Sequence, residues 1–462
     1  MNARWQWGLR APALACMLLV GACKVVGPDY VRPSAPVPAA YKEAAADGRP
    51  DASLAPQWWR LYQDPVLDAL IAQVAVDNQS LAAATARVQQ ARQLVAVAGA
   101  ATQPQVFAGS IKTGRSNEND FGLGASWEID LWGRIKRDIE AHRAAAQASA
   151  DDLAAATLSM QAQVAKSYFM LRERDAAIAL LRQVEELDDQ AVRRLRNQYA
   201  QGVVAQADLA AALARLGGAQ RQLGEARATR AQLEHAIAVM LGKPPADFAI
   251  APAAFDARLP AVPAGLPAKL LERRPDVAAS ERRMAAANAR IGVSQAETLP
   301  SISLAAGIGV REGPTGTVNI HAPLFTGGEL QARVGHERAA YAESVANYRQ
   351  KVLDALREVE DNLAAARALT DAAAVQAAAA QAAREAERVA VNQYRQGVID
   401  HPALVQATSA MAEAGQAELQ LRLRRLDISV DLIEALGGGW QADAERASSK
   451  PVASVDAPPA AR

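Results

Sequence analysis

Cys23 is the residue whose type and position most clearly predict a chemical reaction. It ends the segment VGAC, which follows a start containing Arg4 and Arg10 and the apolar stretch APALACMLLV at 11–20. This order of charged, apolar and small residues is typical of a secretory signal peptide. A signal peptidase that cuts before a cysteine carrying a diacylglyceryl group on its sulfur would leave Cys23 as the lipidated N-terminus.

We therefore predict a signal peptide over residues 1–22 and a lipoprotein with covalent acyl chains, including palmitate, at Cys23. A diacyl group with a further amide-linked chain anchors a protein far more firmly than one myristoyl chain. Lys24 follows the cysteine where inner-membrane lipoproteins would carry aspartate, which favours the outer membrane. The alternative is an ordinary signal peptide in which the cysteine is incidental.

No other set of residues predicts catalysis or metal binding. No two histidines stand four residues apart as a helical metal site requires; the histidines are His142, His235, His321, His336 and His401. The sequence contains no G-x-S-x-G motif, Walker loop or paired CxxC. We predict that the protein is not an enzyme and needs no cofactor besides the lipid. The 50 Lys and Arg residues balance 50 Asp and Glu, so nucleic acid is not an expected partner.

The chain contains an internal duplication. NQYAQGVV at 197–204 recurs as NQYRQGVI at 392–399, a shift of 195 residues, and EIDLWGR at 128–134 has a looser echo in HAPLFTGG at 321–328. The duplication predicts a first repeat over 63–243 with a hairpin at 104–132 and a second repeat over 269–440 with a hairpin at 300–325. A proline-rich crossover at 244–268 would join them. The remaining regions are the signal peptide 1–22, a lipidated extended segment 23–62 and a disordered tail 441–462.

Long helices are predicted in both halves, because no proline interrupts the chain between Arg134 and Lys243 or between Leu324 and His401. Apolar residues at steps of three, four or seven along 134–200 indicate a coiled-coil-like stripe. The expected helices are 65–102, 134–200, 206–241, 276–298, 329–395 and 402–436. A helix over 134–200 would be roughly 100 Å long, which is more than an ordinary globular core needs.

Four short strands with one apolar face are predicted between the helices. In 121–131, Phe121, Leu123 and Trp127 alternate with glycine, serine and acidic residues, and 301–311 and 317–324 alternate similarly, whereas 105–113 alternates poorly. Strands of this length match the requirement for crossing a bilayer while lining water. A soluble sandwich with half-buried strands is the alternative.

Four strands cannot close a membrane barrel, because open sheet edges would leave backbone N–H and C=O groups unsatisfied in lipid. Several chains must therefore pool their strands, and three chains with twelve strands leave an open lumen more naturally than two with eight. We expect Trp132 and Gly133 at the joint between barrel and helices, with Phe325 and Gly327 in the second half. An aromatic ring suits the membrane interface there, and glycine relieves backbone strain.

The sequence resembles the TolC-like outer membrane factor family, in particular its efflux lipoprotein branch. The most similar stretch is LLERRPDVAASERRMAAANARIGVSQAETLPSISL at 270–304, and CKVVGPDYVRP, WEIDLWGR, PLFTGG, YRQGVI and ALGGGW also match. The resemblance covers about 23–440. It implies a mainly α fold with a small transmembrane β part and duplicated halves, forming a homotrimer with a 12-stranded β-barrel continued by an α-helical periplasmic barrel.

The resemblance also implies a gate at the periplasmic tips, formed by the glycine turns between the long helices. Tyr394, Arg395 and Gly397 match the family pattern, Tyr199 and Gly202 are their counterparts in the first half, and Asp208 and Asp400 are nearby carboxylates that would form an acidic ring or cap helices. Gln406 and Ser409 stand where family members carry charged gate residues, so the usual charged contacts are not expected.

The function implied is the passive outer-membrane duct of a tripartite efflux pump, contributing to multidrug resistance. Its partners would be a periplasmic adaptor (membrane fusion) protein, an inner-membrane transporter and outer-membrane lipid. Two alternatives are a duct of the same build for type I protein secretion and a coiled-coil envelope lipoprotein without a pore.

Overall fold

The computed structural model describes residues 25–43, 54–112, 119–262, 267, 272–309 and 313–441. The predicted signal peptide 1–22, Cys23 and, apart from Gln441, the predicted tail 441–462 lie outside these residues. The chain forms two compact units. Of the described residues, the sheet unit draws on those within 25–36, 83–153 and 275–353, and the helical unit on those within 37–82, 154–274 and 354–441.

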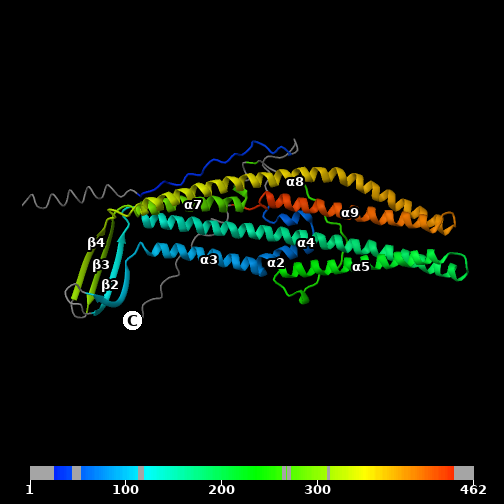
Figure 1. Ribbon diagram of the computed structural model, residues 1–462, viewed down its shortest axis with the longest axis horizontal. Helices are drawn as coiled ribbons and strands as arrows, with labels where there is room; N and C mark the ends of the chain where they lie inside the picture. The colour runs from blue at the N-terminus through cyan, green and yellow to red at the C-terminus, as the bar shows by residue number, and fades with distance from the viewer. Residues whose placement is uncertain are drawn as a thin grey trace, which may run out of the picture. The chain divides into compact units, whose positions relative to one another are not determined.

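The order of helices and strands repeats once along the chain (Figure 1). The elements are η1 (Trp58–Tyr62), α2 (Pro65–Asp77), α3 (Gln79–Ala100), β1 (Gln105–Lys112), β2 (Asn119–Ile129), α4 (Arg134–Ala200), α5 (Gln206–Met240), η2 (Pro245–Asp247), α7 (Pro275–Ala296), β3 (Ser301–Gly309), β4 (Gly313–His321), α8 (Glu329–Arg395) and α9 (His401–Ala435). Helices α4 and α8 each have 67 residues, and α5 and α9 each have 35. The predicted duplication and the bounds of both long helices are confirmed.

The prediction of one helix over 65–102 was wrong, because the chain leaves the helical conformation at Asn78. This residue has φ −68° and ψ 117°. Its Oδ1 accepts a hydrogen bond from the Leu81 N–H (2.9 Å), and its Nδ2 donates to the Met240 carbonyl (2.6 Å). Asparagine competes with helical hydrogen bonding through such local contacts, so α2 ends and α3 begins around it.

The four strands form one antiparallel sheet in the order β1-β2-β3-β4. Within the described residues β1 and β4 each pair on one side only, so the sheet has two open edges. We call one side the polar face; it carries Gly122, Gly124, Ser126, Glu128, Ser301, Ser303, Ala305, Gly307, Thr315, Thr317, Asn319 and His321. We call the other side the apolar face; it carries Val106, Phe121, Leu123, Trp127, Ile302, Leu304, Ile308, Val318 and Ile320.

Large side chains on the apolar face remain exposed. Phe121 is 69% exposed, Val318 62% and Ile320 68%. Patches of this kind mark contact with another protein or with lipid. Among the described residues, no helix has the length and apolar character needed to cross a membrane.

The helical unit is held together by the apolar stripe of α4. Seven of the ten predicted stripe residues are buried, namely Val164, Tyr168, Leu171, Ile178, Leu181, Val192 and Leu195. Of the other three, Val184 and Leu187 are half-buried and Tyr199 is exposed. Ile178 and Leu181 pack against Leu223 and Ala226 of α5, and nearer the turn Val192 and Leu195 pack against Ala212. The two helices therefore pair along much of α5.

A buried ionic network attaches the crossover to α4 and α5. Asp175, 3% exposed at its side chain, pairs with Arg172 (3.1 Å) and Arg230 (2.7 Å). Arg172 Nη1 also donates to the carbonyl of Ala251, and Arg230 Nη2 donates to that of Ile250 (2.7 and 2.5 Å). The charges compensate one another while fixing the backbone at 250–251.

We expect Asp175→Ala to lower the free energy of unfolding by about 3 kcal/mol, since it removes the carboxylate that the buried Arg172 and the half-buried Arg230 share. Asp189→Ala is the control, because the Asp189–Arg193 pair on the same helix is exposed and should contribute less than about 1 kcal/mol. Denaturant unfolding in detergent, followed by circular dichroism at fixed protein concentration, measures both. Equal losses in the two variants would contradict the role of the buried network.

Candidate functional site

The segment that joins β2 to α4 is fixed by its two acidic residues. Glu128 accepts two hydrogen bonds from Arg134, from Nε (3.1 Å) and Nη2 (2.8 Å). Asp130 accepts from the backbone N–H groups of Ile135 and Lys136 (3.1 and 2.9 Å). Those N–H groups lie in the first turn of α4, where helices leave donors unpaired. The strand therefore passes into the helix through side chains that the strand itself supplies.

Trp132 and Gly133 lie between β2 and α4, in this joint. The Trp132 indole N–H donates to the Pro300 carbonyl next to β3 (2.7 Å), and its own carbonyl accepts from Val26 N–H (2.9 Å). Gly133 has φ +76°, and a Cβ there would lie 2.6 Å from Cγ1 of Val25. Glycine is required for both the backbone conformation and the close contact.

The second joint follows β4, which ends before the predicted Phe325. Phe325 is 92% exposed and its neighbour Leu324 is 96% exposed. Gly327 and Gly328 then have φ +61° and +87°, and the chain enters α8 at Glu329. Phe325 thus presents an open apolar surface, whereas Trp132 is held by hydrogen bonds.

The segment 25–30 is bound to the sheet unit beside the first joint. Arg137 of α4 donates to the carbonyls of Val26 and Gly27 and pairs with Asp29 (2.7 Å). Asn288 of α7 donates to the Pro28 carbonyl (2.8 Å). The chain next to Cys23 is therefore attached to the same elements that carry the strands.

The two glycine turns have the predicted conformation. Gly202 and Gly397 have φ +71° and +73°, which reverses the chain after α4 and after α8. Asp400 accepts a hydrogen bond from the Ala403 N–H (3.0 Å) and caps α9, and Asp208 accepts from the Ala205 N–H (3.3 Å) at the start of α5. Both carboxylates are exposed and serve as helix caps.

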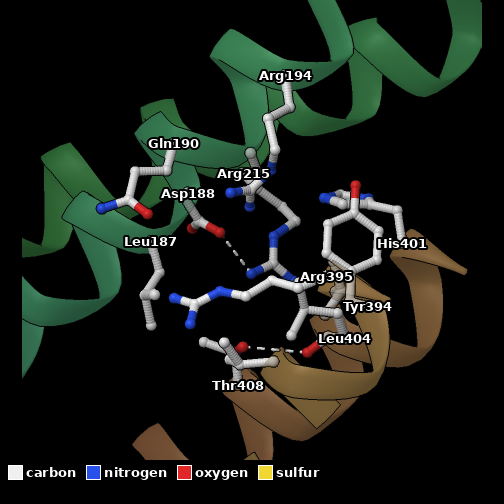
Figure 2. A pocket seen from close by; sticks show the side chains of 13 residues that line it. Leu187, Asp188, Gln190, Arg194, Arg215, Tyr394, Arg395, His401, Leu404 and Thr408 are labelled. Atoms are coloured by element: carbon white, nitrogen blue, oxygen red, sulfur yellow. Dashed lines mark hydrogen bonds and ion pairs between the residues drawn. The ribbon is translucent and has the colours of Figure 1, made fainter. Parts of the chain in front are cut away.

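Close to these turns, side chains of both helix pairs meet around a small cavity (Figure 2). We call Asp188, Arg194, Arg215, Tyr394 and His401 the tip cluster. The Arg194 guanidinium lies over the Tyr394 ring (5.4 Å to the centroid), and the His401 ring meets Tyr394 edge-on (6.0 Å). Asp188 pairs with Arg215 across α4 and α5 (2.7 Å). The cluster therefore links the α4–α5 pair to the α8–α9 pair.

The surroundings of His401 disfavour its charged form. Burial is the largest cause that lowers its pKa below the ordinary 6.5, and the positive charges of Arg215 and Arg194 act in the same direction, while Asp188 and Asp208 oppose them. Neutral His401 is thus the form compatible with the tip cluster.

The structure brings some of the predicted tip residues together and leaves others apart. Tyr394 and Arg395 line the cavity, but Tyr199, the counterpart of Tyr394 in the first half, is 43% exposed and does not line it. Gln406 is exposed as well. Sequence reasoning missed the four other members of the tip cluster, because no local pattern marks them and the contact that joins the two helix pairs, between Arg194 and Tyr394, forms only after folding.

Comparison with known proteins gives consistent matches over nearly the whole chain. The family model described as outer membrane efflux protein matches residues 70–243 and 266–438. The pyoverdine export outer membrane protein OpmQ of Pseudomonas aeruginosa is 30% identical, covering 94% of this chain and 98% of OpmQ. The toluene efflux pump outer membrane protein TtgC of Pseudomonas putida is 31% identical, covering 95% and 97%.

Solved structures agree with these relatives. The outer-membrane channel OprN is similar with a TM-score of 0.81 and 28% identity, covering 90% of this chain and 99% of that one. The open state of the MtrE outer membrane channel of Neisseria gonorrhoeae has a TM-score of 0.80 and 27% identity, with the same coverage.

We expect the tip cluster to weaken on acidification. The folded tip binds a proton on His401 less readily than an unfolded chain does. The free energy that holds the α4–α5 pair against the α8–α9 pair is therefore fully present above pH 6.5, and it is lost as the pH falls below 6.5 through the lower pKa of folded His401. Hydrogen exchange of peptides around 187–215 and 391–408, compared at one pH between wild type and His401→Gln, measures this. The wild type should exchange faster at pH 5.5 and equally at pH 7.5. His235→Gln, an exposed control on α5, should match the wild type, and wild-type exchange no faster than His401→Gln at pH 5.5 would contradict the assignment.

Proposed function

We propose that this chain, which belongs to the outer membrane efflux protein family, forms the exit channel of a tripartite efflux pump as a homotrimer. The observation that carries the proposal is the sheet with two open edges and an exposed apolar face. In lipid, the unpaired backbone groups of β1 and β4 must find partners. Pairing β1 of one copy with β4 of the next satisfies them, and three copies give twelve strands.

The two faces of the sheet support this assembly. The apolar face suits contact with acyl chains, and the glycine, serine, threonine and asparagine residues of the polar face suit a water-filled interior. A barrel of eight strands is narrow enough for side chains to fill it, so three copies give the wider lumen that export requires. The long helices would continue the wall into the periplasm.

We further propose that Cys23 carries the lipid anchor. Segment 25–30 is bound to α4 and α7 by Arg137 and Asn288, so acyl chains on Cys23 would enter the membrane beside the barrel. The exposed ring of Phe325 and the indole of Trp132 fit the interface on the periplasmic side of the outer membrane.

The turns at Gly202 and Gly397 are the proposed contact sites for a periplasmic adaptor, which would connect the channel to an inner-membrane transporter. The relative TtgC is named as part of a toluene efflux pump, which supports such partners. The tip cluster is proposed as the closed gate, since it holds the two helix pairs of a chain together. Arg395 would contribute by lining the same cavity, and Tyr199, Asp208 and Asp400 would contribute indirectly, through the turns that they flank.

Native mass spectrometry of the detergent-purified protein tests the assembly and the anchor together. We expect three copies, each cleaved before Cys23 and heavier than its polypeptide by the mass of attached acyl groups. Cys23→Ser should lose the acyl mass and, once expressed behind a cleavable signal peptide, retain three copies. A single-copy particle would refute the proposed channel, and an unmodified wild-type Cys23 would refute the anchor alone.

We expect Tyr394→Ala to raise the single-channel conductance in planar bilayers, because it removes the ring that Arg194 and His401 contact. Cation–π contacts contribute about 0.5 to 1 kcal/mol at exposed sites, so the gate should be loosened and not abolished. Tyr199→Ala is the matched control in the first half. Unchanged conductance in Tyr394→Ala, or an equal rise in both variants, would exclude the tip cluster as the gate.

A further inference from the structure

One aromatic side chain lies on the polar face of the sheet. Phe107 in β1 is directly opposite Gly124 in β2, and successive residues of a strand point to opposite faces. Phe107 therefore shares a face with Gly124 and Ser126, whereas its neighbour Val106 shares the apolar face with Phe121 and Trp127. Phe107 on the polar face is one cause of the poor alternation of 105–113 in the sequence.

The contact with Gly124 confirms which way the ring points. A Cβ built on Gly124 would lie 2.6 Å from Cζ and 2.7 Å from Cε2 of Phe107. The ring thus lies over the backbone of β2 in space that glycine leaves free. Phe107 is nevertheless 52% exposed, so one side of the ring covers the glycine and the other remains open.

We propose that Phe107 is an aromatic contact in the channel lumen, where it binds planar aromatic groups of the cargo in transit. The inference rests on the proposed trimeric barrel with the polar face inward. The wall beside the ring consists of Gln105 and Gly109 on β1 and Gly122 and Ser126 on β2, and small residues such as Ala305 and Thr317 continue the polar face on β3 and β4. These residues offer hydrogen bonds and little apolar surface, so the phenyl ring is the feature that distinguishes an aromatic molecule from a polar one.

A three-fold channel would contain three copies of the Phe107 contact. Each copy contributes one Phe107, and equivalent rings in a three-fold assembly lie at one height in the barrel. Aromatic rings attract other rings in offset or edge-on geometry and attract cations over their faces. Planar aromatic cations are therefore the class of cargo that this ring would retain most.

Cysteine accessibility in bilayers tests the position of the ring. Phe107→Cys and Val106→Cys are compared during exposure to a membrane-impermeant, negatively charged methanethiosulfonate, which forms a mixed disulfide only with a thiol in water. Phe107→Cys should show a stepwise loss of conductance, and Val106→Cys and the wild type should show none. Modification of Val106→Cys with an unreactive Phe107→Cys would place Phe107 on the lipid side or within a subunit contact and overturn the inference. Absence of channels in the wild type would overturn the proposed function itself.

Open-channel block tests the binding role. Ethidium, a planar aromatic cation, should dwell longest in the wild-type channel, less in Phe107→Leu and least in Phe107→Ala. Tetraethylammonium, which can make only the cation–π contact and no ring stacking, should lose less dwell time than ethidium does when the ring is removed. The leucine variant retains apolar volume without a ring, which separates an aromatic contact from simple narrowing. Equal ethidium dwell times in wild type and Phe107→Leu would overturn the aromatic role.

The ring also stabilises strand pairing by covering a glycine, and a double-variant comparison separates that role from the lumen contact. Gly124→Ala should push the ring away from the wall and further into the lumen, lowering conductance relative to wild type. The same change in a Phe107→Ala background should have no effect on conductance, because no ring remains to be displaced. An equal drop in both backgrounds would show that the ring does not project into the lumen.

Discussion

The structure depends on the hydrogen-bonding requirement of a four-stranded sheet that is open at both edges. In a soluble protein, water forms hydrogen bonds with the unpaired backbone groups of edge strands. Lipid cannot do this for the outer edges of β1 and β4. Since this chain is an outer-membrane channel protein, its sheet is complete only when other copies pair with it. The exposed apolar residues Phe121, Val318 and Ile320 then have a membrane to contact, and the small polar residues opposite them have water.

Beyond the sheet, the chain joins its elements with charged groups that are satisfied locally. Glu128 and Asp130 end the strand and begin α4, and Arg137 ties segment 25–30 to the same helix. Asp175 does the equivalent for the crossover through two arginines. Each of these carboxylates contacts a backbone donor or a guanidinium within a few ångströms, so the strand-to-helix joint and the crossover are fixed without large apolar cores.

Much of the fold was predictable because its signals are local. The absence of proline and the glycine turns set the bounds of α4 and α8, and alternation located three of the four strands. Asn78 was missed although part of its signal is local: its side chain caps α3 through the Leu81 N–H, and only its bond to the Met240 carbonyl depends on the folded chain. The tip cluster was missed because Arg194 meets Tyr394 only after folding. Gate roles for Tyr199, Asp208, Arg395 and Asp400 remain predictions, and the structure shows the two aspartates as helix caps.

The tip cluster breaks the internal symmetry of the chain. Applying the shift of 195 residues, Arg194 corresponds to Val389, Arg215 to Ala410, and His401 to Gln206. None of these counterparts carries the charge or ring that its partner contributes. The two halves have therefore diverged at these positions, so that each helix pair contributes different side chains to the tip cluster. Identical substitutions at matched positions of the two halves are not interchangeable experiments.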